Sequence, residues 1–162
     1  MYRIGEGYDV HRLEAGRPLK IGCVEISSPL GSVAHSDGDV LAHAVVDAIL
    51  GALAEGDIGR HFPPDDPRWA GADSSVFLAE ARRLCDVAGG RIVNVDSTVV
   101  LQRPKLAPQI PQMCEALAKA LGCDAAQVSV KAKTAEGLGA VGEGGAVEAR
   151  AIVFLAFPNA AD

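Results

Sequence analysis

The chain has 162 residues, of which 49% are hydrophobic, and a formal net charge of −6. This length suits one compact domain, so we expect a single domain over residues 1–162. The acidic balance and the lack of Lys/Arg clusters exclude a partner such as a long nucleic acid, whose binding depends on neutralised phosphates. No apolar run approaches the roughly 20 residues of a membrane helix and no signal-peptide core begins the chain, so we expect a cytoplasmic protein without a membrane partner.

The first half of the chain has two strand patterns and then a helix pattern. Residues 2–13 and 19–26 read as strands, the second with a bend or bulge at Gly22. Ser36 is a good N-cap, Asp39 follows it three residues later, and apolar residues then recur at helical spacing as far as Leu53. We therefore expect the first helix to begin at Ser36.

The second half alternates helix and strand signals. A helix is predicted over residues 74–88, a strand over 92–103, and a third helix from Pro108 to Gly122. Strands over residues 128–134 and 147–157 close the chain. This order predicts an α/β fold of the α+β type: a single two-layer domain with a mixed four-stranded sheet and helices on one face.

The last strand is nearly apolar on both faces, because residues 151–157 run Ala-Ile-Val-Phe-Leu-Ala-Phe. A two-layer domain covers only one face of its sheet with helices. We therefore expect copies of the chain to cover the other face in a symmetric oligomer.

Histidines and carboxylates cluster near the N-terminus. Asp9 and His11 alternate on a strand and so point to the same face, and His43 lies on the first predicted helix. One carboxylate and two imidazoles are a common catalytic zinc set with a fourth position left open, although Mn²⁺ or Fe²⁺ also suits these ligand types. The alternative is that Asp9 caps a turn, His11 lies on the surface and His43 is a hydrogen-bonded core residue. The coincidence of the three favours a metal site.

Phosphate-binding features accompany this cluster. His35 and Ser36 are predicted at a helix N-terminus, where backbone N–H groups and the dipole attract phosphate oxygens, although simple capping by Ser36 also explains that residue. Residues 131–139 combine cations, a hydroxyl and glycines with Glu136, a carboxylate that could hold Mg²⁺ together with substrate phosphates. Residues 102–106 form a second loop of this kind.

Four ordered motifs carry a family resemblance. They are Gly-Glu-Gly-Tyr-Asp-Val-His at residues 5–11, Ala-His-Ser-Asp-Gly-Asp-Val at 34–40 with His43, Gly-Asp-Ile-Gly-Arg-His-Phe-Pro at 56–63, and Lys-Thr-Ala-Glu-Gly-Leu-Gly at 133–139. Together they resemble the 2-C-methyl-D-erythritol 2,4-cyclodiphosphate synthases, over nearly the whole chain. The resemblance implies a phosphorus–oxygen lyase of the non-mevalonate isoprenoid pathway, which converts 4-diphosphocytidyl-2-C-methyl-D-erythritol 2-phosphate into the cyclic diphosphate and CMP. It also implies a homotrimer whose sheets pack around a threefold axis.

The resemblance further implies a role for each matching residue. Zn²⁺ is held by Asp9, His11 and His43, and Asp9 and His11 also contact the substrate. His35 and Thr134 are catalytic, Ser36 contacts phosphate, and Glu136 holds Mg²⁺ or Mn²⁺ between two phosphates. The methylerythritol and ribose end of the site is lined by Asp57, Gly59, Phe62 and Asp66. The cytidine pocket is formed by two segments of the neighbouring subunit: Leu101, Gln102, Arg103, Pro104, Lys105, Leu106 and Ala107, and Lys133, Thr134, Ala135 and Glu136.

The chain departs from the family pattern at three positions. Ala140 and Glu143 stand where family members often carry Phe and Arg beside a trimer cavity that takes an isoprenoid diphosphate, so we expect no such ligand here. Pro64 replaces a frequent carboxylate, which bears on the contacts of residues 63–66. Two other functions remain open from the residues: a metal-dependent phosphohydrolase, and a non-catalytic trimeric module with a structural zinc.

Overall fold

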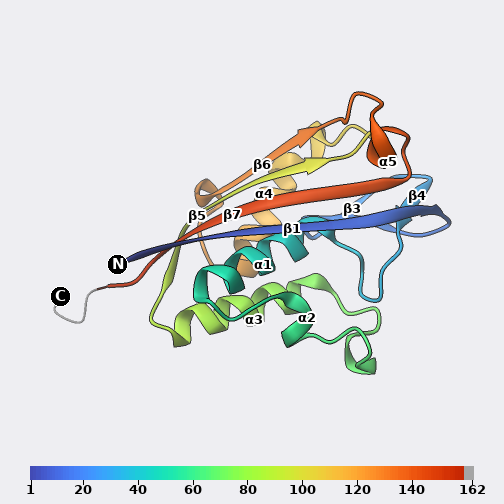
Figure 1. Ribbon diagram of the computed structural model, residues 1–162. Helices are drawn as coiled ribbons and strands as arrows, with labels where there is room; N and C mark the ends of the chain where they lie inside the picture. The colour runs from blue at the N-terminus through green and yellow to red at the C-terminus, as the bar shows by residue number, and fades with distance from the viewer. Residues whose placement is uncertain (159–162) are drawn as a thin grey trace.

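A twisted mixed sheet forms one layer of the protein, in the computed structural model that describes residues 1–158 (Figure 1). The last four residues of the expected domain, 159–162, lie outside the described part. The strand order is β4-β1-β7-β5-β6, with β5 and β6 parallel and the other pairs antiparallel. The strands are β1 (Tyr2–Ala15), β4 (Leu30–Ser32), β5 (Arg91–Val100), β6 (Val128–Lys133) and β7 (Ala146–Ala156).

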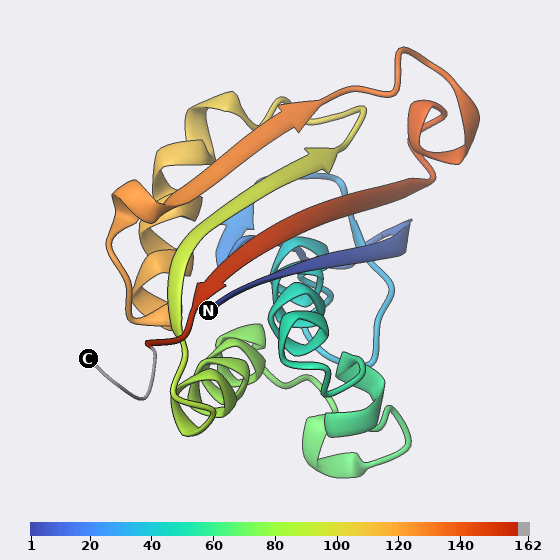
Figure 2. The same cartoon turned by 60° about the vertical axis from the view of Figure 1, so that its left-hand side comes forward.

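Helices cover one face of this sheet, as the second view shows (Figure 2). The mixed sheet with helices on one face confirms the predicted architecture, and the four long strands are those expected. The count of four strands is corrected to five, because the three-residue β4 pairs with the end of β1. The helices are α1 (Val40–Leu53), α2 (Ile58–His61), α3 (Ser74–Val87), α4 (Ile110–Leu121) and α5 (Gly139–Gly142), with 3₁₀ turns at Pro67–Trp69, Ala107–Gln109 and Ala125–Gln127.

The segment 19–26 is a hairpin rather than one bent strand. Its strands β2 (Leu19–Ile21) and β3 (Val24–Ile26) form a separate two-stranded sheet. Gly22 and Cys23 make the turn with φ values of 61° and 62°, the left-handed pair of a type I′ hairpin. The turn is held by Asp39, whose carboxylate accepts the backbone N–H groups of both turn residues at 2.8 and 2.5 Å. A cysteine carries no sequence signal for this conformation, so the prediction of one strand was wrong.

The first helix begins four residues later than predicted. Its N-cap is Asp39, whose carboxylate also accepts the backbone N–H of Ala42 at 3.0 Å, and Ser36 lies in the preceding loop. The expectation that His35 and Ser36 sit on a helix N-terminus is therefore wrong. Asp39 competes better for the cap because it also bonds the hairpin turn. The other two predicted helices, α3 and α4, lie close to their predicted limits, and Gly122 ends α4 with a φ of 62°, whereas the short α2 and α5 were not predicted.

Close packing of β1 against α1 positions the N-terminal half of the molecule. A Cβ atom on Gly7 would lie 2.0 Å from the carbonyl oxygen of Ala44, and one on Gly5 would lie 1.8 Å from that of Ala48. Only glycine allows the two backbones to approach this closely. Because strand residues alternate, Asp9 follows Gly5 and Gly7 on the face that meets α1.

The outer face of the sheet carries an exposed apolar band. Phe154 on β7 stacks on Tyr2 of β1 with ring centroids 5.1 Å apart. The expectation of apolar residues on both faces of the last strand is correct at Ile152, which is 49% exposed, although Glu148 and Arg150 share this face. The exposed apolar side chains of the band are Tyr2, Ile4, Tyr8, Val10 and Ile152.

No helix within residues 1–158 is both long enough and apolar enough to span a bilayer.

Candidate metal centre and its cavity

The structure brings Asp9, His11 and His43 together. Asp9 Oδ2 lies 3.0 Å from His11 Nε2 and 2.9 Å from His43 Nδ1, and the two nitrogens are 3.2 Å apart. This is the one group of three possible metal-ligating side chains found in residues 1–158. The predicted convergence of the three residues is therefore confirmed, and its cause is the packing of β1 on α1.

The donor set fits a divalent transition metal. Ligand atoms that surround zinc tetrahedrally at about 2.0–2.1 Å are about 3.3 Å from one another. The three separations here, 2.9 to 3.2 Å, are only slightly shorter. The other oxygen of Asp9, Oδ1, accepts a hydrogen bond from the backbone N–H of Val10 at 2.8 Å, which leaves Oδ2 for an ion. Three protein ligands leave a position open for substrate.

The protonation state of Asp9 suits this role. Burial raises the pKa of the Asp9 carboxyl, but hydrogen bonds and charge interactions with His11 and His43 outweigh burial and hold it well below its usual range. Burial lowers the pKa of His43, but the hydrogen bond to Asp9 and the charges of Asp9, Asp39 and Asp37 together outweigh burial and raise it, so a metal ion competes with a proton at this ring. Asp9 is therefore a carboxylate near neutral pH, as a metal ligand must be.

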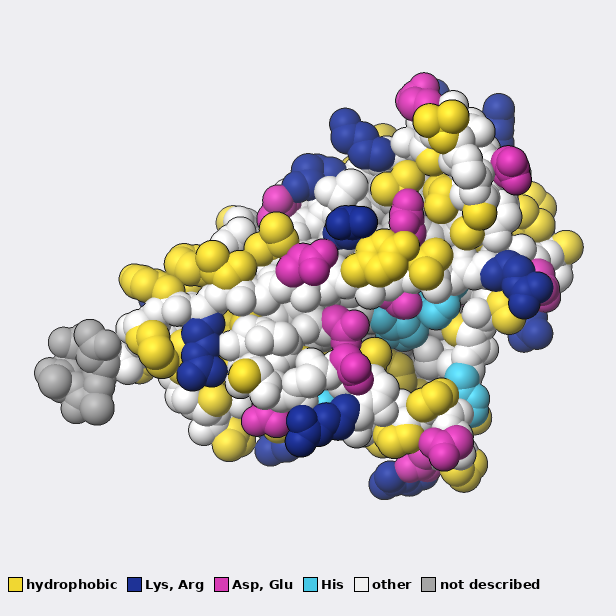
Figure 3. Space-filling model, viewed as in Figure 1, with side chains coloured by type: hydrophobic (Ala, Val, Ile, Leu, Met, Phe, Trp, Pro, Cys, Tyr) yellow, Lys and Arg dark blue, Asp and Glu magenta, His cyan; other side chains and the backbone are white. Residues whose placement is uncertain are grey.

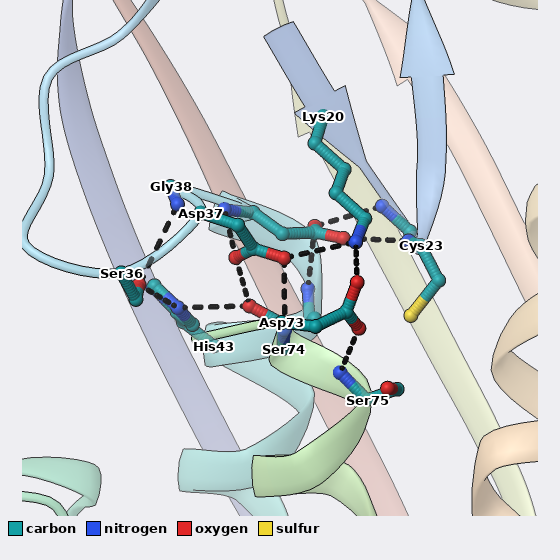
Figure 4. Close-up of polar contacts among 12 residues, drawn as sticks. Lys20, Cys23, Ser36, Asp37, Gly38, His43, Asp73, Ser74 and Ser75 are labelled. Atoms are coloured by element: carbon teal, nitrogen blue, oxygen red, sulfur yellow. Dashed lines mark hydrogen bonds and ion pairs between the residues drawn. The ribbon is translucent and has the colours of Figure 1, made fainter. Parts of the chain in front are cut away.

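The far nitrogen of the His43 ring is held by two hydroxyls. Nε2 lies 3.2 Å from Ser36 Oγ and 3.2 Å from Ser74 Oγ (Figure 4). The Ser74 hydroxyl donates to Asp37, and the Ser74 backbone N–H donates to the same carboxylate at 2.8 Å. Ser74 is fully buried at the start of α3. The sequence analysis missed Ser74 and Asp37, because contacts between distant segments leave no mark on local spacing.

A cavity of about 380 Å³ opens over the three ligands. Histidine side chains gather in this hollow on the face shown in Figure 3. Of the predicted site residues, His35, Ser36, Gly59 and Phe62 line it together with Asp9, His11 and His43. The lining that was not predicted consists of Val33, Ala34, Ile58, Pro64, Trp69 and Phe77.

Three aromatic rings build one wall of the cavity. Phe62 lies 4.5 Å from Phe77 and 5.0 Å from Trp69, measured between ring centroids. Phe77 was predicted only as part of the apolar stripe of α3. A helical stripe of this kind serves equally for core packing and for lining a cavity, so its second role depends on the tertiary fold.

Two predicted carboxylates lie outside this lining. Asp57 caps α2 by accepting the N–H of Arg60 at 3.0 Å. Asp66 accepts three hydrogen bonds from the Arg68 side chain at 2.5 to 3.1 Å and caps the turn at Pro67–Trp69. Both residues belong to the segment that borders the cavity, but Oδ1 of Asp57 and both oxygens of Asp66 already accept hydrogen bonds from the chain.

The remaining predicted residues lie together at another edge of the sheet. Residues 101–107 follow β5 and residues 133–136 follow the parallel β6, and the backbone N–H of Leu101 donates to Lys133 at 2.9 Å. None of them lines the cavity over the metal ligands. The Leu101 and Leu106 side chains are buried in the core. Arg103, Lys105, Ala107, Lys133, Thr134 and Glu136 are exposed, and Gln102, Pro104 and Ala135 are half-buried.

Comparison with known proteins identifies the class. The family model described as YgbB family matches residues 2–156. A 2-C-methyl-D-erythritol 2,4-cyclodiphosphate synthase of Verminephrobacter eiseniae is 59% identical over 155 residues, which cover 94% of this chain and 85% of that protein. The Gloeobacter violaceus synthase is 54% identical over 153 residues, with 94% of each chain covered. The chain therefore belongs to the YgbB family.

Solved structures agree with this family assignment. A structure described as 2C-methyl-D-erythritol-2,4-cyclodiphosphate synthase superimposes with a TM-score of 0.88 at 44% identity, over 95% of this chain and all of the other. A Plasmodium falciparum structure described as an IspF CDP complex gives a TM-score of 0.86 at 38% identity, over 98% and 97% of the two chains. The chain is thus an enzyme of the isoprenoid pathway with cyclodiphosphate synthase function.

Proposed function

We propose that Asp9, His11 and His43 hold a divalent transition metal, Zn²⁺, at the floor of the cavity. The observation that carries this proposal is the convergence of one carboxylate oxygen and two imidazole nitrogens within 2.9 to 3.2 Å of one another beside a cavity of about 380 Å³. When bound, the ion supplies positive charge that neutralises a substrate phosphate.

His35 and Ser36 bind and orient the β-phosphate in this proposal. Both line the cavity next to the metal ligands, and their segment is fixed by the Gly71 N–H, which donates to the His35 carbonyl at 2.8 Å. Gly59 and Phe62 line the same cavity and contact the methylerythritol end of the substrate, with Asp57 and Asp66 at its border.

The second half of the site comes from a neighbouring copy in a homotrimer packed around a threefold axis. The loops 101–107 and 133–136 adjoin one another and leave Arg103, Lys105, Lys133, Thr134 and Glu136 exposed, as a pocket for the cytidine group of a neighbour's substrate requires. The apolar band on the outer face of the sheet and the 76% exposed Leu138 provide surface for the contact between copies.

Thr134 and Glu136 act on the diphosphate from this neighbouring loop. The Thr134 hydroxyl donates to Glu136 Oε1 at 2.8 Å, so the two side chains form one polar unit. Glu136 is the carboxylate for Mg²⁺ or Mn²⁺, which prefer one or two carboxylates and several phosphate oxygens. Thr134 and His35 then contact the phosphate from opposite copies.

The chemistry is an in-line phosphoryl transfer within one substrate molecule. An oxygen of the 2-phosphate attacks the β-phosphorus, the bond from that phosphorus to the bridging oxygen breaks, and CMP leaves with that oxygen and the bond's electron pair. The chain supplies no covalent nucleophile. His35, Ser36 and Thr134 hold the reacting groups in line, and the walls of Phe62 and Phe77 exclude water from the β-phosphorus.

The test is turnover of 4-diphosphocytidyl-2-C-methyl-D-erythritol 2-phosphate with Zn²⁺ and Mg²⁺, followed by phosphorus NMR. CMP and a cyclic diphosphate formed together are the expected result. CMP with an open-chain product would indicate a hydrolase and overturn the proposed positioning. Sedimentation of the same sample reports the trimer, and metal analysis of Asp9→Ala, His11→Ala and His43→Ala chains reports the ligand set.

A further inference from the structure

The two nitrogens of the His43 ring lie in different surroundings. Nδ1 faces Asp9 and His11, and Nε2 faces the hydroxyls of Ser36 and Ser74. A neutral imidazole carries its hydrogen on only one nitrogen, and a metal binds only the nitrogen without it. The tautomer of His43 therefore decides whether Nδ1 can be a ligand.

The Ser74 hydroxyl has its hydrogen committed to Asp37. A carboxylate only accepts hydrogen bonds, so the Ser74 O–H must point at Asp37. The lone pairs of Ser74 Oγ are then left to face His43 Nε2, 3.2 Å away. Only an imidazole with hydrogen on Nε2 can donate to them. While no metal is bound, Asp9 Oδ2 at 2.9 Å also attracts a hydrogen to Nδ1, so the link to Ser74 matters once a metal ion replaces that hydrogen and Nε2 carries the remaining one.

Asp37 is itself held in place from several sides. Its Oδ2 accepts the Ser74 N–H at 2.8 Å and the Lys20 ammonium at 3.0 Å, while its Oδ1 accepts the Ser74 hydroxyl and the Asp39 N–H, the latter at 3.3 Å. Lys20 also pairs with Asp73, which caps α3 (Figure 4). Burial raises the pKa of Asp37, but the bonds from Ser74 and Lys20 outweigh it and lower the pKa.

We infer that Ser74 is a positioning residue for the metal centre: its hydroxyl, oriented by Asp37, holds His43 in the tautomer that presents Nδ1 as a ligand. This inference rests on the proposed metal role of His43 and adds a requirement to it. Partners of this kind on the outer nitrogen of a ligating histidine typically change metal affinity by about 10- to 100-fold when mutated.

Ser36 offers a matched comparison on the same nitrogen. Its Oγ is equally 3.2 Å from Nε2, but no carboxylate lies behind it among the described contacts, and the Gly38 N–H at 3.5 Å only donates to it. The Ser36 hydroxyl can therefore rotate to serve either tautomer. The inference assigns the selection of the tautomer to Ser74 and not to Ser36.

Asp37→Asn is the sharpest variant because it keeps the size of the side chain. The amide oxygen must take the Oδ2 position, which receives both the Ser74 N–H and Lys20. The amide NH₂ then faces the Ser74 hydroxyl and donates to it, so that the hydroxyl hydrogen turns toward His43 Nε2. We expect the hydrogen bond from His43 Nε2 to Ser74 to be lost and the metal affinity to fall by about 10- to 100-fold.

The experiment measures two quantities on four variants of the full chain: Ser74→Ala, Ser74→Thr, Ser36→Ala and Asp37→Asn. Long-range ¹H–¹⁵N NMR of the Zn²⁺-loaded protein reports the hydrogen on His43 Nε2 and the rate at which it exchanges with solvent, which a hydrogen bond to Ser74 slows. Competition with a chromophoric chelator reports the affinity for Zn²⁺. Thermal unfolding identifies any variant that fails to fold.

The expected result is a slowly exchanging Nε2–H in the wild-type chain, in Ser36→Ala and in Ser74→Thr, whose hydroxyl restores the link. In Ser74→Ala this hydrogen should exchange faster, and the Zn²⁺ affinity should fall about tenfold. The inference is overturned if Ser74→Ala and Asp37→Asn keep both quantities at wild-type values. If the wild-type chain binds no Zn²⁺, the proposed metal function fails; if it binds Zn²⁺ and Ser74→Ala binds it equally well, only the inference fails.

Discussion

The cavity over Asp9, His11 and His43 and the pair of loops after β5 and β6 carry most of the predicted site residues, but only at the cavity do side chains from separate elements converge. At the cavity, Asp9, His11 and His43 reach one another across two elements, and Ser74 supports His43 from a third. At the loops, Thr134 and Glu136 bond each other and otherwise face outward.

This difference separates the part of the site that a single chain forms from the part that, in the proposed function, a second chain completes. Ligand convergence depends on the packing of β1 on α1, which the chain makes by itself. A substrate pocket formed by exposed loops needs an opposing surface. The cavity should therefore respond to mutation as an intrachain site, and the loops as a site shared between copies.

The largest effect is expected from His43→Ala, which removes one of three ligands. We expect the loss of about one bound Zn²⁺ per chain and a fall in turnover of at least about 1,000-fold, because the metal neutralises charge in the transition state. Far-UV circular dichroism should show an intact fold, since α1 keeps its apolar contacts.

His61→Ala provides the control for that variant. The His61 ring donates to the Glu55 carbonyl at 3.1 Å and does not line the cavity over Asp9, His11 and His43, so metal content and turnover should stay at wild-type levels. Full turnover of His43→Ala would contradict the metal assignment and remove the basis of the comparison.

Glu136→Ala should lower turnover by about 100-fold and raise the Mg²⁺ concentration needed, while the Zn²⁺ content stays unchanged. Coexpression with His43→Ala then tests whether sites are shared. In a mixed trimer a site is intact when its metal ligands come from a Glu136→Ala chain and its loop from a neighbouring His43→Ala chain. With equal amounts of the two chains, about a quarter of the sites meet this condition, so about a quarter of wild-type turnover should return. No recovery would place both halves of the site in one chain.

Gly7→Ala should lower the free energy of unfolding by about 3 kcal/mol or more, because the new Cβ would lie 2.0 Å from a backbone oxygen of α1, the helix that β1 packs against below the cavity. Chemical denaturation measures the free energy of unfolding. Gly51→Ala is the matched control in the same layer: its Cβ would lie 3.7 Å from the nearest atom, and the helix should gain about 0.5–1 kcal/mol. Equal losses in both variants would refute the packing argument.

The smallest effect concerns the ion pairs of Lys20. The pKa of Asp73 is lowered to about 2 by its bonds from Lys20 and Ser75, and that of Asp37 is also lowered. A carboxyl whose pKa is lowered by folding stabilises the fold at a pH above its pKa in the unfolded chain, 3.8. This contribution is lost as the pH falls through its pKa in the folded chain. Lys20→Met should therefore cost about 1–2 kcal/mol near neutral pH, and the difference from wild type should narrow between pH 4 and about 2. A difference that stays constant over this range would contradict the pairing.

Several parts of the fold were predictable because they depend on neighbours in sequence. Alternation on a strand placed Asp9 and His11 on one face, and helical spacing placed His43 on α1. The end of α4 at Gly122 follows from the ease with which glycine adopts a positive φ. The shift of the first helix start to Asp39 was not predictable, since it depends on a hairpin turn 16 and 17 residues away.

The sequence by itself determined the order of the four long strands and of α1, α3 and α4, the identity of the three possible metal ligands and the loops that accompany them, because residue type and periodicity act locally. Only the tertiary structure decided that Ser74 and Asp37 stand behind His43, and that Phe62 and Phe77 close the cavity. These contacts join β1, α1 and α3, whose relative placement is set by core packing and by the close approach that Gly5 and Gly7 allow. Such placement is a property of the whole fold and has no local signature in the chain.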